Sequence, residues 1–348
     1  MTDAIRLPDW DTAGRWAGRL APAGPTTSRA EASALVAGLR DAAERARPLA
    51  LRASGLAGAL DASGRSDAVV PVLVVDRPGW AAAAGASFAA FSTAIDTRDA
   101  APLNPGVTAQ AAAVLGLLSS KVLGQFDPYA RGSRPDGRLI LVAPNVLNSE
   151  RTLGVNPDDF RLWVCVHEQT HALQFAAAPW LAEHVRGEAA ELLREVAATG
   201  PTQEASAVLA GLARALRGGG EWSMLDVLPE AQRVRVERLT AVMSLLEGHA
   251  DVTMDAVGRR DIPSVRTLRS RLEARRGTTK GPADLFLRRI LGLDAKLAQY
   301  RNGAAFVRAV RESGPDALDA VWSGPKALPL PGEIADPQAW VRRVHGGS

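Results

Sequence analysis

The segment Trp163–Ala178 contains the pattern His-Glu-x-x-His, whose defined positions are His167, Glu168 and His171. Two histidines that lie four residues apart on a helix project from the same face, one turn apart. This spacing allows two imidazoles to bind one zinc ion, while the glutamate between them reaches a water molecule that the metal activates. The pattern therefore predicts a zinc site with His167 and His171 as ligands and Glu168 as the catalytic base.

The residues around this pattern argue against a solvent-exposed helix that carries it by chance. Val164, Val166, Leu173 and Phe175 are apolar. Ionisable groups inside an apolar helix need a compensating partner, because burial of an unpaired charge is costly. A bound metal ion would be such a partner.

The same stretch carries helix signals at both ends. Asn156 can cap the helix, Pro157 suits its first position, and the pair Asp158 and Asp159 complements the positive end of the helix dipole. Pro179 ends the helix. The sequence therefore predicts one helix of about 20 residues with the pattern in its middle.

A catalytic zinc site usually has three protein ligands and one open position, so a third ligand is required. Glu247 is favoured, because it lies on an apolar helical stripe where a carboxylate needs a cation, a proton or a metal. Asp251 lies on the same face and could accept the outer N–H of a zinc-bound histidine. His249 is a competing ligand, about 200° away from Glu247 around the helix, so that the two cannot bind one ion. His184 and His345 are weaker candidates, and the absence of a third ligand also stays open.

Composition and charge exclude several classes of protein. Of the 348 residues, 47% are hydrophobic and 23% charged, which is typical of a globular protein, and a net charge of +3 is too small to indicate nucleic-acid binding. The single cysteine, Cys165, excludes an internal disulfide and fits a reducing compartment and a place in the core. The N-terminus lacks the features of a signal peptide, and the apolar stretches are too short to span a membrane. We therefore expect a cytoplasmic protein with neither a membrane nor a nucleic acid as partner.

Hydrophobic patterning predicts an α+β protein that is mostly helical. The apolar runs Val69–Val75 and Arg138–Val142 predict two strands, whereas Gly124–Tyr129 is expected to form a loop. A long helix is expected over Pro229–Val257, which includes Glu247.

The chain is long enough for one large domain or two. We expect an N-terminal helical region with the small sheet, residues 1–150, and a helical region with the zinc site, residues 151–348. The two regions are expected to form one compact unit.

The His-Glu-x-x-His pattern, followed by Glu247-x-x-x-Asp251, resembles the gluzincin branch of zinc metallopeptidases. The resemblance implies that His167, His171 and Glu247 bind zinc and that Glu168 is the catalytic base. It also implies that Asp251 supports one of the histidines.

The chain also resembles an actinobacterial family of zinc-dependent metalloproteases that is labelled as associated with the biosynthesis of a deazaflavin coenzyme. This resemblance implies a zincin-like core, with a small sheet beside the helix of the two histidines, and a peptide or protein as substrate. Gln174 and Ala177 stand where the separate metzincin class requires glycine and histidine, so that class is excluded. The resemblance to the actinobacterial family covers most of the chain, namely Val75–Trp80, Leu123–Tyr129, Leu141–Asn145, Phe160–Phe175, Pro179–Leu181, Leu246–Asp251 and Leu291–Tyr300.

We expect a zinc-dependent hydrolase that cuts a peptide or amide bond, with the substrate paired along the strand Arg138–Val142. Tyr300, Tyr129 and His249 are candidates for stabilising the oxyanion. The alternative is a zinc-binding scaffold, or pseudo-enzyme, that acts through a protein partner. Nucleic-acid binding through the seven arginines of Arg259–Arg276 is disfavoured, because this segment has no aromatic residue.

Overall fold

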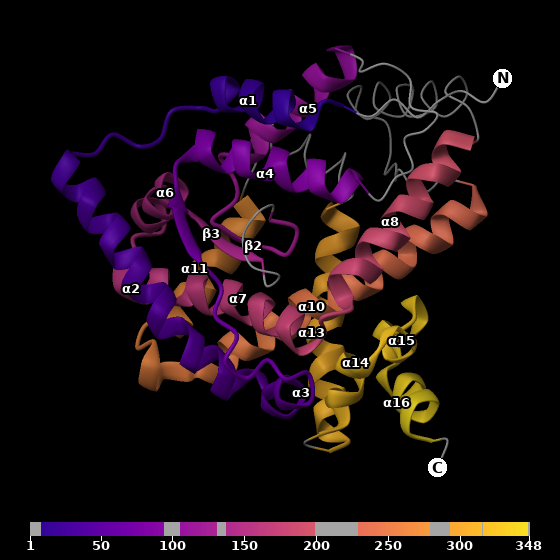
Figure 1. The fold of residues 1–348 in the computed structure, drawn as a ribbon. Coiled ribbons are helices and arrows are strands. Elements are labelled where there is room, and N and C mark those ends of the chain that lie inside the picture. Colours follow the sequence, from indigo (N-terminus) through magenta and orange to yellow (C-terminus); the bar gives the residue numbers. More distant parts are fainter. Residues whose placement is uncertain are drawn as a thin grey trace.

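The computed structural model describes residues 8–93, 105–130, 137–198, 229–278, 293–314 and 316–346, which form a small sheet surrounded by helices (Figure 1). The strands are β1 (Val72–Val75), β2 (Gly124–Asp127) and β3 (Arg138–Val142). The N-terminal helices are α1 (Trp10–Leu20), α2 (Arg29–Ser54), α3 (Ala57–Ala62), α4 (Arg77–Ser92), α5 (Pro105–Leu118) and α6 (Ala143–Leu153). The later helices are α7 (Pro157–Ala177), α8 (Leu181–Ala198), α10 (Glu230–Asp261), α11 (Val265–Thr278), α13 (Leu293–Glu312), α14 (Ala320–Ser323), α15 (Pro331–Ala335) and α16 (Pro337–His345), with short 3-10 helices at η2 (Ala317–Asp319) and η3 (Pro325–Ala327).

The sheet separates two layers of helices (Figure 1). Along β3, Leu139 and Leu141 pack into the core that contains α2 and α7, whereas Ile140 and Val142 pack into the core formed by α1, α4 and α5. Successive side chains of a strand point to opposite faces, so this apolar run buries both faces of the sheet. The α+β fold class, mostly helical with a small sheet, is thereby confirmed.

The central strand of the sheet is β3, and β2 forms one edge. β3 pairs in parallel with β1 and in antiparallel fashion with β2. The expectation of a loop over Gly124–Tyr129 is wrong for Gly124–Asp127. The Gly and Pro residues of this segment suggested a turn, but Gln125 accepts a hydrogen bond from the Trp80 indole (3.0 Å), and Asp127 accepts one from Ser87 (2.6 Å). These tertiary partners satisfy the polar side chains that made the segment resemble a loop.

Helix α7 begins and ends where the sequence predicted. The Asn156 side chain accepts a hydrogen bond from the Asp159 N–H (3.0 Å), Pro157 occupies the first turn, and the helix ends at Ala177. Most of its residues are buried, since α7 packs against α2 and α10 on its sides and against β2 and β3 of the sheet. A helix buried in this way can hold polar side chains only if they find partners within the protein.

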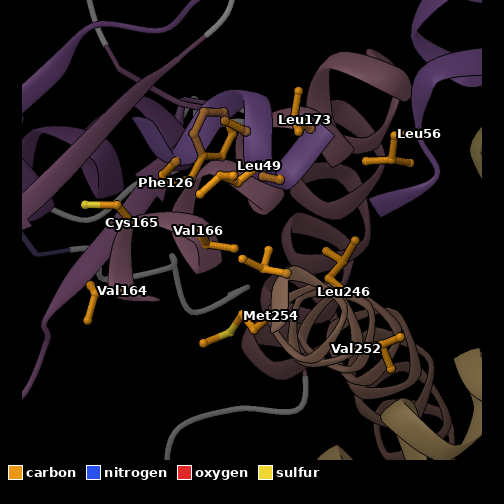
Figure 2. Close-up of a cluster of buried hydrophobic side chains, with 14 of the residues drawn as sticks. Leu49, Leu56, Phe126, Val164, Cys165, Val166, Leu173, Leu246, Val252 and Met254 are labelled. Carbon is orange, nitrogen blue, oxygen red and sulfur yellow. The ribbon is translucent and has the colours of Figure 1, made fainter. Parts of the chain in front are cut away.

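Helix α10 brings Glu247 to the same part of the molecule. Its regular part ends at Val257, because Gly258 has a left-handed backbone conformation (φ 72°) that interrupts the helix. Leu246 and Met254 on α10 and Val166 on α7 belong to one buried apolar cluster (Figure 2). This packing positions the polar residues of the two helices relative to one another.

Cys165 is fully buried in this core, as expected from the sequence (Figure 2). No helix within the described residues is both long and apolar enough to span a bilayer.

Candidate metal centre

Two imidazole rings lie side by side on one face of α7. The Nε2 atoms of His167 and His171 are 3.1 Å apart, and the ring planes are nearly perpendicular, at 89°. Burial and the neighbouring His171 lower the pKa of His167 to about 4, so that its ring is neutral at neutral pH. A neutral imidazole has one nitrogen with a free lone pair, as metal binding requires.

Glu247 reaches this pair of histidines from α10. Its Oε2 atom lies 3.5 Å from His167 Nε2, and its Oε1 atom lies 3.7 Å from His171 Nε2. The carboxylate is 31% exposed, so it lies at the boundary between the core and solvent. Among the residues that the structure describes, these three form the one group of histidine, cysteine or acidic side chains that could hold a metal ion.

The spacing of the three ligand atoms fits zinc. Bonds of about 2.0–2.1 Å in a tetrahedral site place two ligand atoms about 3.3 Å apart. The two Nε2 atoms are 3.1 Å apart, and each lies 3.5 or 3.7 Å from one of the two oxygens of the Glu247 carboxylate, which is close to this value. Two imidazoles and one carboxylate also match the ligand types that zinc takes in catalytic sites.

Glu168 is directed towards the edge strand β2. A Cβ atom at Gly124 would lie 2.7 Å from Glu168 Cγ and 2.8 Å from Oε1, so the side chain occupies space that only a glycine leaves open. The carboxylate accepts a hydrogen bond from the backbone of Phe126. Burial, followed by the nearby Glu247 carboxylate, raises the pKa of Glu168 to about 8. A carboxyl group in this range can gain or lose a proton near neutral pH.

Residues 9–341 match the zincin-like metallopeptidases. This chain belongs to the zincin-like metallopeptidase family. It is also similar to a crystal structure from Chloroflexus aurantiacus, provisionally described as a hydrolase with a novel fold, with a TM-score of 0.63 and 30% sequence identity over 97% of this chain and 98% of the other. No curated protein matches the chain. The family and the structural neighbour together support a hydrolase.

In this zincin-like site, Asp251 does not contact either histidine. Its Oδ1 atom accepts a hydrogen bond from Arg269 (2.8 Å), and its backbone carbonyl accepts a second one from the same guanidinium (2.9 Å). The expectation that Asp251 accepts the outer N–H of a histidine is corrected by this geometry. The reason lies in the packing of α11, which places the Arg269 guanidinium beside Asp251, so that the carboxylate forms an ion pair there.

The outer nitrogens of the two histidines have other partners. His171 Nδ1 lies 2.9 Å from Gln174 Oε1, and His167 Nδ1 lies 3.3 Å from Met254 Sδ. Sequence reasoning did not assign a role to either residue. A signal was present for Gln174, because residues three apart on a helix are neighbours and Gln174 follows His171 at this spacing.

The other histidines lie apart from the three-residue group. His249 is buried, and its Nδ1 and Nε2 atoms contact Gln174 and the Ser54 carbonyl. Burial, and then the Arg311 cation, lower the pKa of His249 to about 3. His184 packs against Trp180, and His345 contacts the Ala317 carbonyl.

Gly248, next to Glu247 on α10, leaves room for the neighbouring helix α13. A Cβ atom at Gly248 would overlap the backbone of Gly303 on α13. The glycine therefore allows α10 and α13 to cross closely.

Two of the candidate oxyanion residues, Tyr129 and His249, have partners away from the three ligands. The Tyr129 hydroxyl donates to the Ala182 carbonyl (2.9 Å), and burial raises its pKa. His249 is separated from the ligand atoms by Gln174 and His171. The side chain of Tyr300 lies outside the described part of the structure.

Two arginines of the basic segment have intramolecular partners. Arg269 binds Asp251, and Arg271 donates to the Leu153 carbonyl (2.6 Å). These two side chains therefore stabilise the packing of α11.

Proposed function

We propose that this protein is a zinc-dependent peptidase that hydrolyses a peptide or amide bond. His167, His171 and Glu247 hold the zinc ion, and Glu168 is the general base. The observation that carries the proposal is the convergence of two imidazole nitrogens and the Glu247 carboxylate, whose ligand atoms lie within 4.8 Å of one another, beside the buried carboxyl group of Glu168. Family membership adds independent support.

Zinc supplies Lewis acidity, which lowers the pKa of water towards about 7 and polarises a substrate carbonyl. Glu168 accepts the proton of the attacking water on a carboxylate oxygen and then donates it to the leaving nitrogen. The Phe126 N–H holds the carboxylate in place during both transfers. With a cation held by the three ligands, the ionised form of Glu168 would be favoured, and Glu168 would then act as a base.

The substrate backbone pairs with β2 in this proposal. The earlier expectation that it pairs with β3 is wrong, because β3 already has β1 and β2 on its two sides. The Val142 N–H donates to the Leu123 carbonyl (2.9 Å), and hydrogen-bonded pairs alternate along an antiparallel ladder. The backbone groups of Gly124 and Phe126 therefore point away from β3, towards the side of β2 that no other described strand covers. The Phe126 N–H binds Glu168, so the Gly124 N–H and the two carbonyl groups are the ones that would pair with a peptide. An extended peptide that adds to this edge lies next to Glu168.

Zinc content and peptide hydrolysis test the proposal together. We expect the purified protein to bind one zinc ion and to cleave members of a synthetic peptide mixture, as followed by mass spectrometry. Glu168→Gln should keep the zinc and lose about 10²- to 10⁴-fold in cleavage rate, because only the base is removed. His171→Ala should lose the zinc.

A scaffold that acts through a partner gives a different result. In that case the wild type and Glu168→Gln would bind zinc equally, and neither would cleave a peptide. A protein that binds no zinc under metal-replete conditions would contradict both functions.

A further inference from the structure

We infer that Gln174 and His249 form a hydrogen-bonded relay that positions His171 for metal binding. The relay is defined by four groups: the His171 ring, the Gln174 amide, the His249 ring and the Ser54 carbonyl. The inference rests on the proposed function, since it concerns the zinc ligand His171. It assigns Gln174 and His249 as positioning residues.

The Gln174 amide has one defined orientation. Its Nε2 atom lies 2.9 Å from the Leu246 carbonyl of α10, which can only accept a hydrogen bond. The amide nitrogen must therefore face Leu246, and Oε1 must face His171 Nδ1, at 2.9 Å. The side chain is fully buried, so no water competes for these groups.

This orientation determines the tautomer of His171. Oε1 is an acceptor, so His171 Nδ1 carries the ring proton and donates it. Nε2 then has a free lone pair, and this atom is the one that faces His167 Nε2 and Glu247. Gln174 thus prepares the nitrogen that binds the metal.

His249 holds the Gln174 amide in place through a hydrogen bond. The second N–H of the Gln174 amide faces His249 Nδ1 at 2.9 Å, so Nδ1 accepts and the ring proton lies on Nε2. Nε2 donates to the Ser54 carbonyl at 2.9 Å, although the Arg311 guanidinium also lies 3.3 Å from it. The Ser54 carbonyl also accepts a hydrogen bond from Arg311 (2.5 Å), whose cation disfavours a second proton on His249. The Oε1 atom and both N–H groups of the Gln174 amide thus have hydrogen-bond partners, so the position of the side chain is well determined.

His167 lacks such support. Its Nδ1 faces the Met254 thioether sulfur at 3.3 Å, and a thioether is a weak acceptor. The relay therefore acts on one ligand only, and its loss should be measurable in metal affinity. Partners of this kind typically change metal affinity by about 10- to 100-fold when they are removed.

Zinc affinity, measured by competition with a chromogenic chelator, tests the relay. Gln174→Met keeps the size of the side chain and removes its polar groups, and we expect zinc to bind about 10- to 100-fold more weakly. Gln169→Met is the matched control, because Gln169 is also buried on α7 and donates to a backbone carbonyl, that of Ala43 at 3.1 Å. The control should bind zinc as the wild type does. Equal affinities for Gln174→Met and Gln169→Met would overturn the relay.

A double-mutant cycle tests the place of His249. His249→Leu should also weaken zinc binding, because it removes the acceptor that holds Gln174. If this effect passes through Gln174, the double variant with Gln174→Met binds zinc no more weakly than Gln174→Met alone. Fully additive losses would show that His249 acts by another route and would overturn the relay.

Nitrogen-15 NMR spectroscopy of the metal-free wild type measures the tautomers of the histidine rings directly. This test does not depend on whether a variant folds. We expect the His171 signal of the Nδ1–H tautomer and the His249 signal of the Nε2–H tautomer. The opposite tautomer at either ring would overturn the relay. Wild-type protein that binds no zinc would instead overturn the proposed function and the relay with it, so the two failures are distinguishable.

Discussion

The side chain of Glu168 lies against the backbone of Gly124, at a distance that leaves no space for a Cβ atom. The contact joins the helix of the two histidines to the edge strand of the sheet. It sets the position of the carboxyl group relative to the backbone groups that would bind a peptide.

Gly124→Ala should therefore impair catalysis and leave zinc binding unchanged. The new methyl group would come 2.7 Å from Glu168 Cγ, so that the carboxyl group must move. A displacement of about 1 Å at a catalytic group can cost about 10²-fold in rate. The measurements are the rate of peptide cleavage and the zinc content. Gly187→Ala on α8 is the control, because a Cβ there meets nothing within 4 Å. Unchanged cleavage by Gly124→Ala would contradict the proposed position of the base.

The stability of the metal-free protein should fall as the pH rises from 6.5 to 8. The pKa of Glu168 is about 8 in the folded chain and about 4.5 as an ordinary carboxyl group. Between these values the folded state holds a proton that the unfolded state has released, so the free energy of unfolding decreases with increasing pH. His167 and His249, whose pKa values are lowered to about 4 and about 3, have the opposite effect only below about 6.5.

Urea unfolding in the presence of a chelator, across pH 6.5 to 8, measures this effect. Glu168→Gln should remove the decrease, which amounts to at most about 1.4 kcal/mol per pH unit for one proton. If the free energy of unfolding falls equally with pH in the wild type and in Glu168→Gln, the raised pKa of Glu168 is not the cause of the decrease.

Removing the charge of Glu247 and removing that of Asp251 should have different effects on zinc affinity. Glu247→Gln should strongly weaken zinc binding, because it removes the carboxylate that lies 3.5 Å from His167 Nε2. Asp251→Asn should leave zinc affinity near the wild-type value and reduce stability by about 0–1 kcal/mol, since its partner is the partly exposed Arg269. Titration with zinc and thermal unfolding measure the two effects. A large loss of zinc affinity in Asp251→Asn would restore it as a supporting residue of the metal site.

Gly248→Ala should destabilise the fold. The methyl group would overlap the backbone of Gly303, and forced overpacking of this kind costs about 1–3 kcal/mol. The midpoint of urea unfolding measures the change, and Gly187→Ala again provides the control. An unchanged midpoint would mean that α10 and α13 can separate at this crossing without cost.

Much of the candidate site could be predicted from local sequence. The helix of His167 and His171 follows from the Asn156 cap, the proline after it and the proline beyond its end, and the one-turn spacing brings both rings to one face. Glu247 could be named because a carboxylate among apolar helical neighbours needs a partner. Backbone geometry within a helix depends on a few consecutive residues, so the helix ends and the face of each side chain can be predicted from the sequence.

The partners of these residues could not be predicted in the same way. Asp251 pairs with Arg269, which lies 18 residues away on another helix, and His171 is linked through Gln174 to His249 and, across 195 residues, to Ser54. Side-chain hydrogen bonds depend on which groups meet after the helices pack, and several competing partners fit the same sequence pattern.

The sequence alone thus determined which residues could bind a metal and which could act as a base. Only the tertiary structure decided that β2 is the edge strand, that Gly124 makes room for Glu168, and that an amide faces His171. The reason is physical. Helical spacing is set by backbone geometry over a few residues, whereas strand order and buried hydrogen bonds are set by contacts between segments that are distant in the chain.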